Sequence, residues 1–545
     1  MPNTTLNGAR RATHAIAATL LAVTACWSLP ATAQATQGTQ ATTARPTPVY
    51  TGNYIVRWRD GSQSVSSSQM RTVEANTGLT LNVKRSMAGT LQLLSVADAK
   101  GDAPEAVAAR LRQDPRIADA VPDRWLRLHD TVPNDPEFAV NQPYMGPPSQ
   151  VVGGANLPRA WDRSRGSSGI VVAVVDTGYL PHPDLADRLV PGYDFISTTT
   201  VSNDGDGRDS DATDPGDFVP AGTTCPDGTG QANSTWHGTR VAGVLGALTN
   251  NGVGIAGVDW AARIQPVRVS GRCGALLSDT VDGMRWAGGL AVPGVPGNPT
   301  PAKVVNISLG GGTCSTIEQQ AVNDLNAAGV VVVAAAGNSA GAVEAPADCT
   351  GVIAVTAHAN DGENASYANV GPQVAISAPG GGCGNSRVVM VGTTPTCSSP
   401  GGSSVIRTPS NAGTTTATTY LISNSAGTSF ASPMVAGVVS MMFAVNVALT
   451  PAQVTAGLKS SARPHPANTF CTTGTNVGKC GAGLLDADGA LAAAANPAAV
   501  AAPAPATPAA SSGGGGGGGA MTPWSAGVLL VIGVVGFAMR RRMGG

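Results

Sequence analysis

The chain has 545 residues, a length typical of two or three domains of about 100 to 200 residues each. Charged residues make up only 12%, and 33 basic residues face 34 acidic ones, so no overall field attracts nucleic acid and a nucleic-acid-binding function is not expected. Glycine and proline contribute 70 and 39 residues while apolar residues reach 42%, which indicates a loop-rich globular chain and argues against extensive disorder.

Residues 1–33 have the pattern of a signal peptide. Arg10 and Arg11 precede an apolar, alanine-rich run over 15–29, and small residues at 31–33 suit a signal peptidase. Two alternatives stay open, because an arginine pair also occurs in twin-arginine signals and residues 23–26 resemble a bacterial lipobox, which would leave a lipid on Cys26. We expect general secretion across the inner membrane.

Residues from about 50 to 128 show six predicted elements. Apolar runs predict strands over 54–58, 79–87, 91–96 and 117–128, with one helix after the first strand and another over 103–113. The order β-α-β-β-α-β predicts a small α+β, ferredoxin-like unit. A proline-rich connector over 132–148 follows it.

From residue 169 onward, short apolar strands alternate with helical stretches. The predicted strands lie at 170–175, 264–269, 304–308, 330–333 and 352–355. Continuous valine and isoleucine runs are typical of strands covered on both faces, so we expect an α/β fold with a mostly parallel sheet and helices on both faces. Reactive groups in such folds lie at the carboxyl ends of the strands.

Three motifs place reactive side chains at such positions. Asp176 ends the first strand in VVAVVDTG, His237 opens a helix in WHGTRVAG, and Ser429 stands just before a helix in GTSFASPMVAG. Each residue alone has an ordinary structural interpretation as a turn, a core histidine or a cap. Together and in this order they resemble the subtilase family of serine proteases, over about residues 135–490. The pattern departs at Arg240, where most relatives carry a second histidine.

The resemblance implies a role for each of these residues. Ser429 would attack a peptide carbonyl, His237 would accept and return its proton, and Asp176 would orient the imidazole. Asn338, after the run AAAG, would join the Ser429 N–H in holding the oxyanion. The alternative for Asn338 is a left-handed turn after Gly337.

The resemblance also implies a substrate edge at residues 308–311. The expected substrate-binding residues are Ser308, Leu309, Gly310, Ala335 and Gly337. Glu344 either lies at the floor of the primary pocket, where it would favour arginine or lysine, or points to solvent, which is our expectation. The glycosylation triplet at Asn306 is discarded, because a glycan there would block the cleft.

The small N-terminal unit resembles a subtilase propeptide, so residues 34–130 are expected to fold the enzyme, inhibit it and be cut off between Leu128 and Asn134. A permanent accessory domain is the alternative. Residues 131–493 would then be the peptidase domain, which we expect to be a monomer acting on protein or peptide substrates.

An acidic loop over 203–217 suits a hard cation. Oxygen-rich flexible loops bind Ca²⁺, and subtilases commonly carry calcium-stabilised loops. The candidate structural Ca²⁺ ligands are Asp206, Asp209, Asp211 and Asp214. The alternative is a solvated turn.

Eight cysteines follow residue 33, an even number that implies disulfides in an exported chain. The sequence leaves their connectivity open, and we expect neighbours to pair. The expected pairs are Cys225–Cys273, Cys314–Cys349, Cys383–Cys397 and Cys471–Cys480. The absence of any CxxC spacing disfavours a metal-thiolate site.

At the C-terminus, an Ala/Pro/Gly-rich linker over 494–519 leads into residues 520–545, an apolar run closed by three arginines. This order resembles the C-terminal sorting signals of Gram-negative bacteria, which a sorting protease removes; a simple membrane anchor is the alternative. The mature protein is accordingly expected to be secreted or held at the cell surface.

The sequence thus predicts an exported, calcium-dependent serine endopeptidase made as a zymogen. Two alternatives remain: a catalytically impaired surface binding protein with the same fold, and an acyl-transferring peptidase that joins peptides.

Overall fold

The computed structural model describes residues 50–61, 65–97, 101–125, 130–399 and 402–497. The signal peptide, the glycine-rich linker, the apolar tail and part of the expected propeptide cleavage region lie outside these ranges. The chain divides at Leu128 into two compact units, each of which is described by itself.

The N-terminal unit is a four-stranded antiparallel sheet with two helices. Its elements are β1 (Tyr50–Trp58), α1 (Ser67–Thr77), β2 (Leu81–Ser86), β3 (Leu91–Val96), α2 (Pro104–Leu111) and β4 (Ile117–Arg124). The strands lie in the order β2-β3-β1-β4, as in a ferredoxin-like unit. Alternate residues of β1, Tyr54, Val56 and Trp58, are buried with Val73 of α1 and Leu111 of α2. The predicted order of elements is confirmed, although β4 ends earlier than expected.

The second unit is built on a seven-stranded parallel sheet, which confirms the predicted fold class. Its strands are β5 (Val171–Asp176), β6 (Tyr193–Asp194), β7 (Arg263–Arg268), β10 (Val304–Ile307), β11 (Val331–Ala335), β12 (Ile353–His358) and β13 (Val374–Pro379). They lie in the order β13-β12-β11-β10-β5-β7-β6. The chain passes from β7 on one side of β5 to β10 on the other, so the strand order reverses beside β5, where ligands bind in open α/β sheets.

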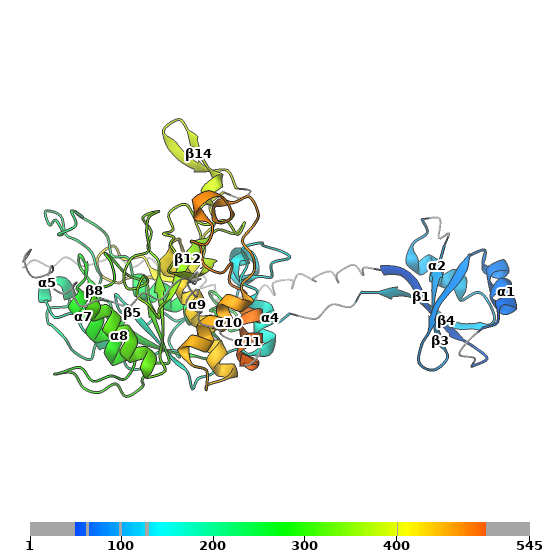
Figure 1. Ribbon diagram of the computed structural model, residues 1–545, viewed down its shortest axis with the longest axis horizontal. Helices are drawn as coiled ribbons and strands as arrows, with labels where there is room; N and C mark the ends of the chain where they lie inside the picture. Colours follow the sequence, from blue (N-terminus) through cyan, green and yellow to red (C-terminus); the bar gives the residue numbers. More distant parts are fainter. Residues whose placement is uncertain (1–49, 62–64, 98–100, 126–129, 400–401, 498–545) are drawn as a thin grey trace, which may run out of the picture. The chain divides into compact units, whose positions relative to one another are not determined.

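Helices cover both faces of this sheet (Figure 1). They are α6 (His237–Gly246) and α9 (Thr428–Val445) on one face and α7 (Leu277–Ala287) and α8 (Thr316–Ala327) on the other. The hydrophobic core on the side of α6 and α9 is called the first core, and the one on the side of α7 and α8 the second core. Because successive side chains of a strand point to opposite faces, Val172 and Val174 of β5 belong to the first core, while Ala173 and Val175 belong to the second.

The helix α9 runs through the first core. Among the described residues it is the one helix long and apolar enough to span a membrane, but 89% of it is buried inside the unit. The apolar composition of α9 is therefore explained by its burial in this core. Packed against it lies α11 (Ala487–Ala495), which in turn contacts α10 (Pro451–Ser461) and α4 (Leu157–Arg163).

Two antiparallel hairpins were not predicted, in addition to a short one between β8 (Ser270–Gly271) and β9 (Gly274–Ala275). One joins β14 (Val388–Val391) to β15 (Thr394–Cys397) and projects from the body of the unit in Figure 1. The other joins β16 (Ile406–Asn411) to β17 (Tyr420–Ser425) and packs on α6. The second was missed because its strands are rich in serine, threonine and asparagine and one contains a proline, a poor strand signal.

All four expected disulfides are present. The bonded pairs are Cys225–Cys273, Cys314–Cys349, Cys383–Cys397 and Cys471–Cys480. Each bond closes a local loop, so the cysteines pair with their neighbours along the chain, as predicted.

Candidate active site

A carboxylate and an imidazole meet at the carboxyl edge of the sheet. Asp176 is the last residue of β5, and His237 is the first residue of α6. The Nδ1 atom of His237 lies 2.8 Å from Oδ1 and 2.9 Å from Oδ2 of Asp176. The side chain of Asp176 is only 1% exposed, whereas that of His237 is 26% exposed, so the far edge of the imidazole remains accessible.

Opposing effects set the pKa of His237. Burial alone lowers this pKa, but the charge and hydrogen bond of Asp176, together with the charge of Asp217, outweigh burial and raise it above its ordinary value. Arg240, the residue that departs from the family pattern, lowers it. The guanidinium Nε of Arg240 donates to the Ser410 hydroxyl of β16 at 3.1 Å, which holds the charge on α6 beside the hairpin.

A threonine that the sequence analysis did not single out ties this pair together. The hydroxyl of Thr177 accepts from the Gly238 N–H at 3.0 Å and donates to Oδ2 of Asp214 at 2.8 Å. Asp214 also accepts from the Gly216 N–H at 2.9 Å. Since Thr177 follows Asp176 and Gly238 follows His237, this hydroxyl links the neighbours of both residues. Its position inside the aspartate motif was the available signal.

Ser429 lies in the first turn of α9, one residue inside the helix and not just before it as expected. Its hydroxyl donates to the Ser308 carbonyl at 3.0 Å, and the Ser308 hydroxyl donates to the Ser429 carbonyl at 2.9 Å. Pro433 explains the second bond: a proline four residues on has no N–H, so it leaves the Ser429 carbonyl without its helical donor.

In this arrangement of the described residues, Ser429 and His237 are not hydrogen-bonded to each other. The imidazole instead packs on the ring of Phe430, the next residue of α9, with 5.6 Å between ring centroids. A hydrogen bond between these two side chains would require the Ser429 hydroxyl to turn away from the Ser308 carbonyl. Hydrogen bonds between catalytic groups commonly form only when substrate is bound.

A cavity of about 290 Å³ opens beside Ser429. All five expected substrate-binding residues line this cavity: Ser308, Leu309, Gly310, Ala335 and Gly337. The other lining residues are Asn338, Ser339, Glu344, Thr428 and Ser429. Glu344 thus lies in the pocket wall, so its expected orientation toward solvent is wrong. The edge at 308–311 lies just past β10 and is anchored by the Gly311 N–H, which donates to the Ala345 carbonyl at 3.0 Å.

Asn338 presents its amide at the same cavity. Its Oδ1 accepts from the N–H of Thr428 at 2.8 Å and from the Thr428 hydroxyl at 3.0 Å, which orients the amide against the start of α9. The backbone of Gly337, with φ of 109°, supplies the left-handed turn, so the alternative role for Asn338 as the turn residue does not hold.

Asn306 and Ser432 form a buried bridge behind Ser308. The amide of Asn306 donates to the Ser308 hydroxyl at 3.0 Å and accepts from the Ser432 hydroxyl at 2.7 Å. The side chain of Asn306 is fully buried, which agrees with discarding the glycosylation triplet. Ser432 lies inside the serine motif, but its contact with β10 could not be inferred from that motif.

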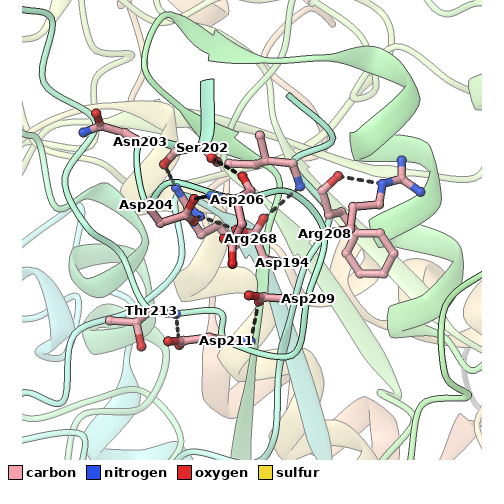
Figure 2. Close-up of polar contacts among 12 residues, drawn as sticks. Asp194, Ser202, Asn203, Asp204, Asp206, Arg208, Asp209, Asp211, Thr213 and Arg268 are labelled. Atoms are coloured by element: carbon pink, nitrogen blue, oxygen red, sulfur yellow. Dashed lines mark hydrogen bonds and ion pairs between the residues drawn. The ribbon is translucent and has the colours of Figure 1, made fainter. Parts of the chain in front are cut away.

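The acidic loop is partly neutralised by arginine (Figure 2). The buried guanidinium of Arg268 pairs with Asp194 and Asp204, so these two carboxylates already have a cation. Burial nevertheless raises the pKa of Asp194 to about 7. Asp194 and Asp204 were not among the expected metal ligands, and the sequence analysis did not predict that Arg268 pairs with them.

Three of the four expected metal ligands, Asp206, Asp209 and Asp211, lie on this loop, but in the described structure their ligand oxygens do not all come within 4.8 Å of one another. The negative charge of Asp209 raises the pKa of Asp206, the mark of two carboxylates facing each other. Asp209 and Asp211 each accept a backbone N–H two residues on, through one oxygen, which leaves the other oxygen for a cation. Asp214 does not join them, because it is 2% exposed and engaged by Thr177, and burial raises its pKa to about 7. The expectation that Asp214 shares a site with the other three is corrected accordingly.

A second pair of carboxylates was missed. Asp135 and Asp184 are 3% and 1% exposed and face the loop at 249–255. Burial raises the pKa of Asp184 to about 6, and the charge of Asp135 adds to the effect. Such a like-charged buried pair suits a divalent cation. By contrast, the cluster of Cys314, Asp348 and Cys349 does not suit a metal, because its two sulfurs form a disulfide.

Comparison with known proteins identifies the class. A model of the subtilase family matches residues 167–485, more than half of the chain. An "Extracellular protease" of Xanthomonas campestris pv. campestris is 41% identical over 460 residues, which cover 81% of this chain and 73% of that protein. An "Extracellular basic protease" of Dichelobacter nodosus is 42% identical over 262 residues, covering 47% of this chain and 42% of that protein.

A solved structure gives the same answer. It is that of a protease from Pseudoalteromonas arctica, with a TM-score of 0.59 and 43% identity, over 67% of this chain and all of that one. The fold and the motifs define a subtilisin-like serine protease with an α/β fold. The chain belongs to the subtilase family, and it is a serine endopeptidase of that family.

Proposed function

We propose that this chain is a secreted endopeptidase in which Ser429 is the nucleophile, His237 the general base and Asp176 the group that orients it. The Asp176–His237 pair, at the strand edge where the Ser429 pocket opens, carries the proposal. His237 takes the Ser429 proton as the hydroxyl oxygen bonds to the peptide carbon, and then returns it to the leaving amine. Water repeats the cycle on the acyl-enzyme.

Asn338 and the backbone N–H of Ser429 are proposed to hold the oxyanion. The contacts with Thr428 engage the Asn338 amide oxygen, so the amide nitrogen carries the donors for the oxyanion, and Asn338 lines the cavity together with Ser429. Placing donors before the charge develops lowers the barrier, and removing one such donor typically costs a factor of about 10² to 10³ in turnover.

The small N-terminal unit is proposed to be a propeptide that the enzyme removes from itself. Support comes from its separate compactness and from the division of the chain at Leu128, next to the expected cleavage region. Export is supported by relatives described as extracellular proteases. The C-terminal segment is proposed to be a sorting signal or an anchor that keeps the protein at the surface.

A structural Ca²⁺ ion is proposed on the acidic loop. Asp206, Asp209 and Asp211 would hold it, since hard cations prefer several carboxylate oxygens on a flexible loop. The ion would neutralise the mutual repulsion of Asp206 and Asp209 and so stabilise the loop.

The test is the intact mass, with terminal peptide mapping, of the secreted wild-type, Ser429→Ala and Ser460→Ala proteins. Ser460, an exposed serine of α10, is the matched control. We expect the wild type and the control to lose the residues up to the division of the chain near Leu128, and Ser429→Ala to keep them. Identical cutting of all three would show that another protease matures the chain and would favour a surface binding protein.

A further inference from the structure

We infer that Glu344 selects substrates with lysine or arginine immediately before the cleaved bond. This inference rests on the proposed function, because it assigns a side-chain preference to the cavity beside Ser429. When Ser429 attacks a carbonyl, the side chain of the residue that carries this carbonyl lies next to Ser429, and the cavity of about 290 Å³ is the space beside it.

Glu344 is the one charged residue among those that line this cavity. The other lining residues are small, polar or apolar, and none of them carries a positive charge that would pair with the carboxylate. A neutral wall with a single carboxylate favours a long cationic side chain, because a charge-assisted hydrogen bond is about twice as strong as a neutral one.

The carboxylate is held in place and keeps one oxygen free. Oε1 of Glu344 accepts from the Ser339 hydroxyl and from the Asn369 amide, both at 3.1 Å. Among the described residues no hydrogen bond reaches Oε2. Asn369 is itself fully buried, and its Oδ1 accepts from the Ser339 and Gly341 N–H groups at 2.9 Å. These bonds anchor the loop that leads to Glu344.

Two glycines of the cavity wall pack closely against Glu344. A Cβ added to Gly337 would come within 3.0 Å of Cδ of Glu344, so the carboxyl group lies directly against that wall. A Cβ added to Gly310 on the opposite edge would lie 3.9 Å from Cβ of Glu344. These Cβ atoms would also come within 2.3 Å of the Asn369 amide nitrogen and 2.4 Å of the Ala345 carbonyl oxygen, respectively, so glycine at both positions allows the close packing that keeps Glu344 in the cavity wall.

The experiment measures kcat/KM of the mature enzyme on peptides that differ only in the residue before the cut: lysine, arginine, glutamine, methionine or glutamate. We expect wild type to favour lysine and arginine over glutamine and methionine by about tenfold to a hundredfold. Glu344→Gln, whose amide oxygen can still accept from Ser339 and Asn369, should abolish this preference, measured as the ratio of kcat/KM after lysine to that after methionine. Glu344→Lys should shift the preference toward glutamate. Asp187→Asn removes an exposed carboxylate outside this cavity and serves as the charge-matched control.

Equal rates on all peptides in wild type would overturn the inference and leave the proposed function standing, and this outcome needs no variant to fold. A preference that persists in Glu344→Gln would also overturn it. If the mature enzyme cleaves none of the peptides, the proposed function and the inference fall together.

Discussion

At the scale of the residue, the site depends on charges placed around one imidazole. Asp176 comes from β5, Asp217 from the loop before α6, and Arg240 from α6 itself, and all three act on the pKa of His237. The first two raise it and the third lowers it. The departure at Arg240 therefore has a predictable effect on catalysis although Arg240 is not part of the proposed triad.

Neutralising Asp217 and Arg240 should move the acid limb of the activity profile in opposite directions. In the proposed mechanism catalysis needs neutral His237, so activity should fall as the pH drops through the pKa of His237. Arg240→Gln removes a charge that lowers this pKa, and the acid limb of kcat/KM should shift to higher pH. Asp217→Asn should shift it to lower pH. Shifts of the same sign in the two pH profiles would contradict this assignment.

Asp214 should make stability depend on pH. Burial raises its pKa from 3.8 to about 7, so the fold favours the protonated carboxyl group. The resulting stabilisation is complete below about pH 4 and is lost as the pH rises through 7. Asp214→Asn, which stays neutral, should raise the melting temperature at pH 8 more than at pH 5. The melting temperatures at both pH values are measured in the Ser429→Ala chain, which prevents self-cleavage, and Asp187→Asn is the control. Equal changes in melting temperature at the two pH values would refute the assignment.

At the scale of the element, Pro433 and Ser308 couple α9 to β10. Proline removes the donor of the Ser429 carbonyl, and the Ser308 hydroxyl replaces it across the interface. In the Ser429→Ala chain, Ser308→Ala should cost about 1–3 kcal/mol by leaving that buried carbonyl unsatisfied. Pro433→Ala restores a helical N–H, so the same Ser308→Ala change should cost less in that background.

The measurement is a double-mutant cycle on the melting temperature or on urea unfolding. Ser460→Ala, on the neighbouring helix, provides a serine-to-alanine control outside the interface. Additive effects of Ser308→Ala and Pro433→Ala would contradict the exchange of donors.

At the scale of the whole molecule, Ca²⁺ should stabilise the peptidase unit. An ion that binds only the folded chain raises its stability by mass action. Removing Ca²⁺ with a chelator should lower the melting temperature of Ser429→Ala by several degrees. A combined Asp206→Asn and Asp209→Asn change should reduce this difference, while Asp187→Asn should not. An unchanged chelator effect in the double variant would place the ion elsewhere, with the buried Asp135–Asp184 pair the next candidate.

The sequence predicted much of this molecule from local signals. Valine and isoleucine runs predicted five strands of the main sheet, and the order of elements predicted the small antiparallel unit. The motifs around Asp176, His237 and Ser429 predicted where chemistry would lie, and the structure brings Asp176 and His237 into contact. The hairpin of β16 and β17 was missed because its polar, proline-containing strands lack the apolar pattern on which the prediction depends.

What the sequence alone determined is what short stretches of chain encode: strand and helix periodicity, disulfides between neighbouring cysteines, and three motifs that define a subtilase. The tertiary structure alone decided which distant groups share one environment. It turned the side chain of Asp214 away from the other expected ligands of the acidic loop and buried it against Thr177, paired Arg268 with Asp194 and Asp204, and placed Glu344 in the pocket wall. The reason is physical: burial, charge pairing and side-chain direction depend on neighbours that only folding brings together, and no local pattern records them.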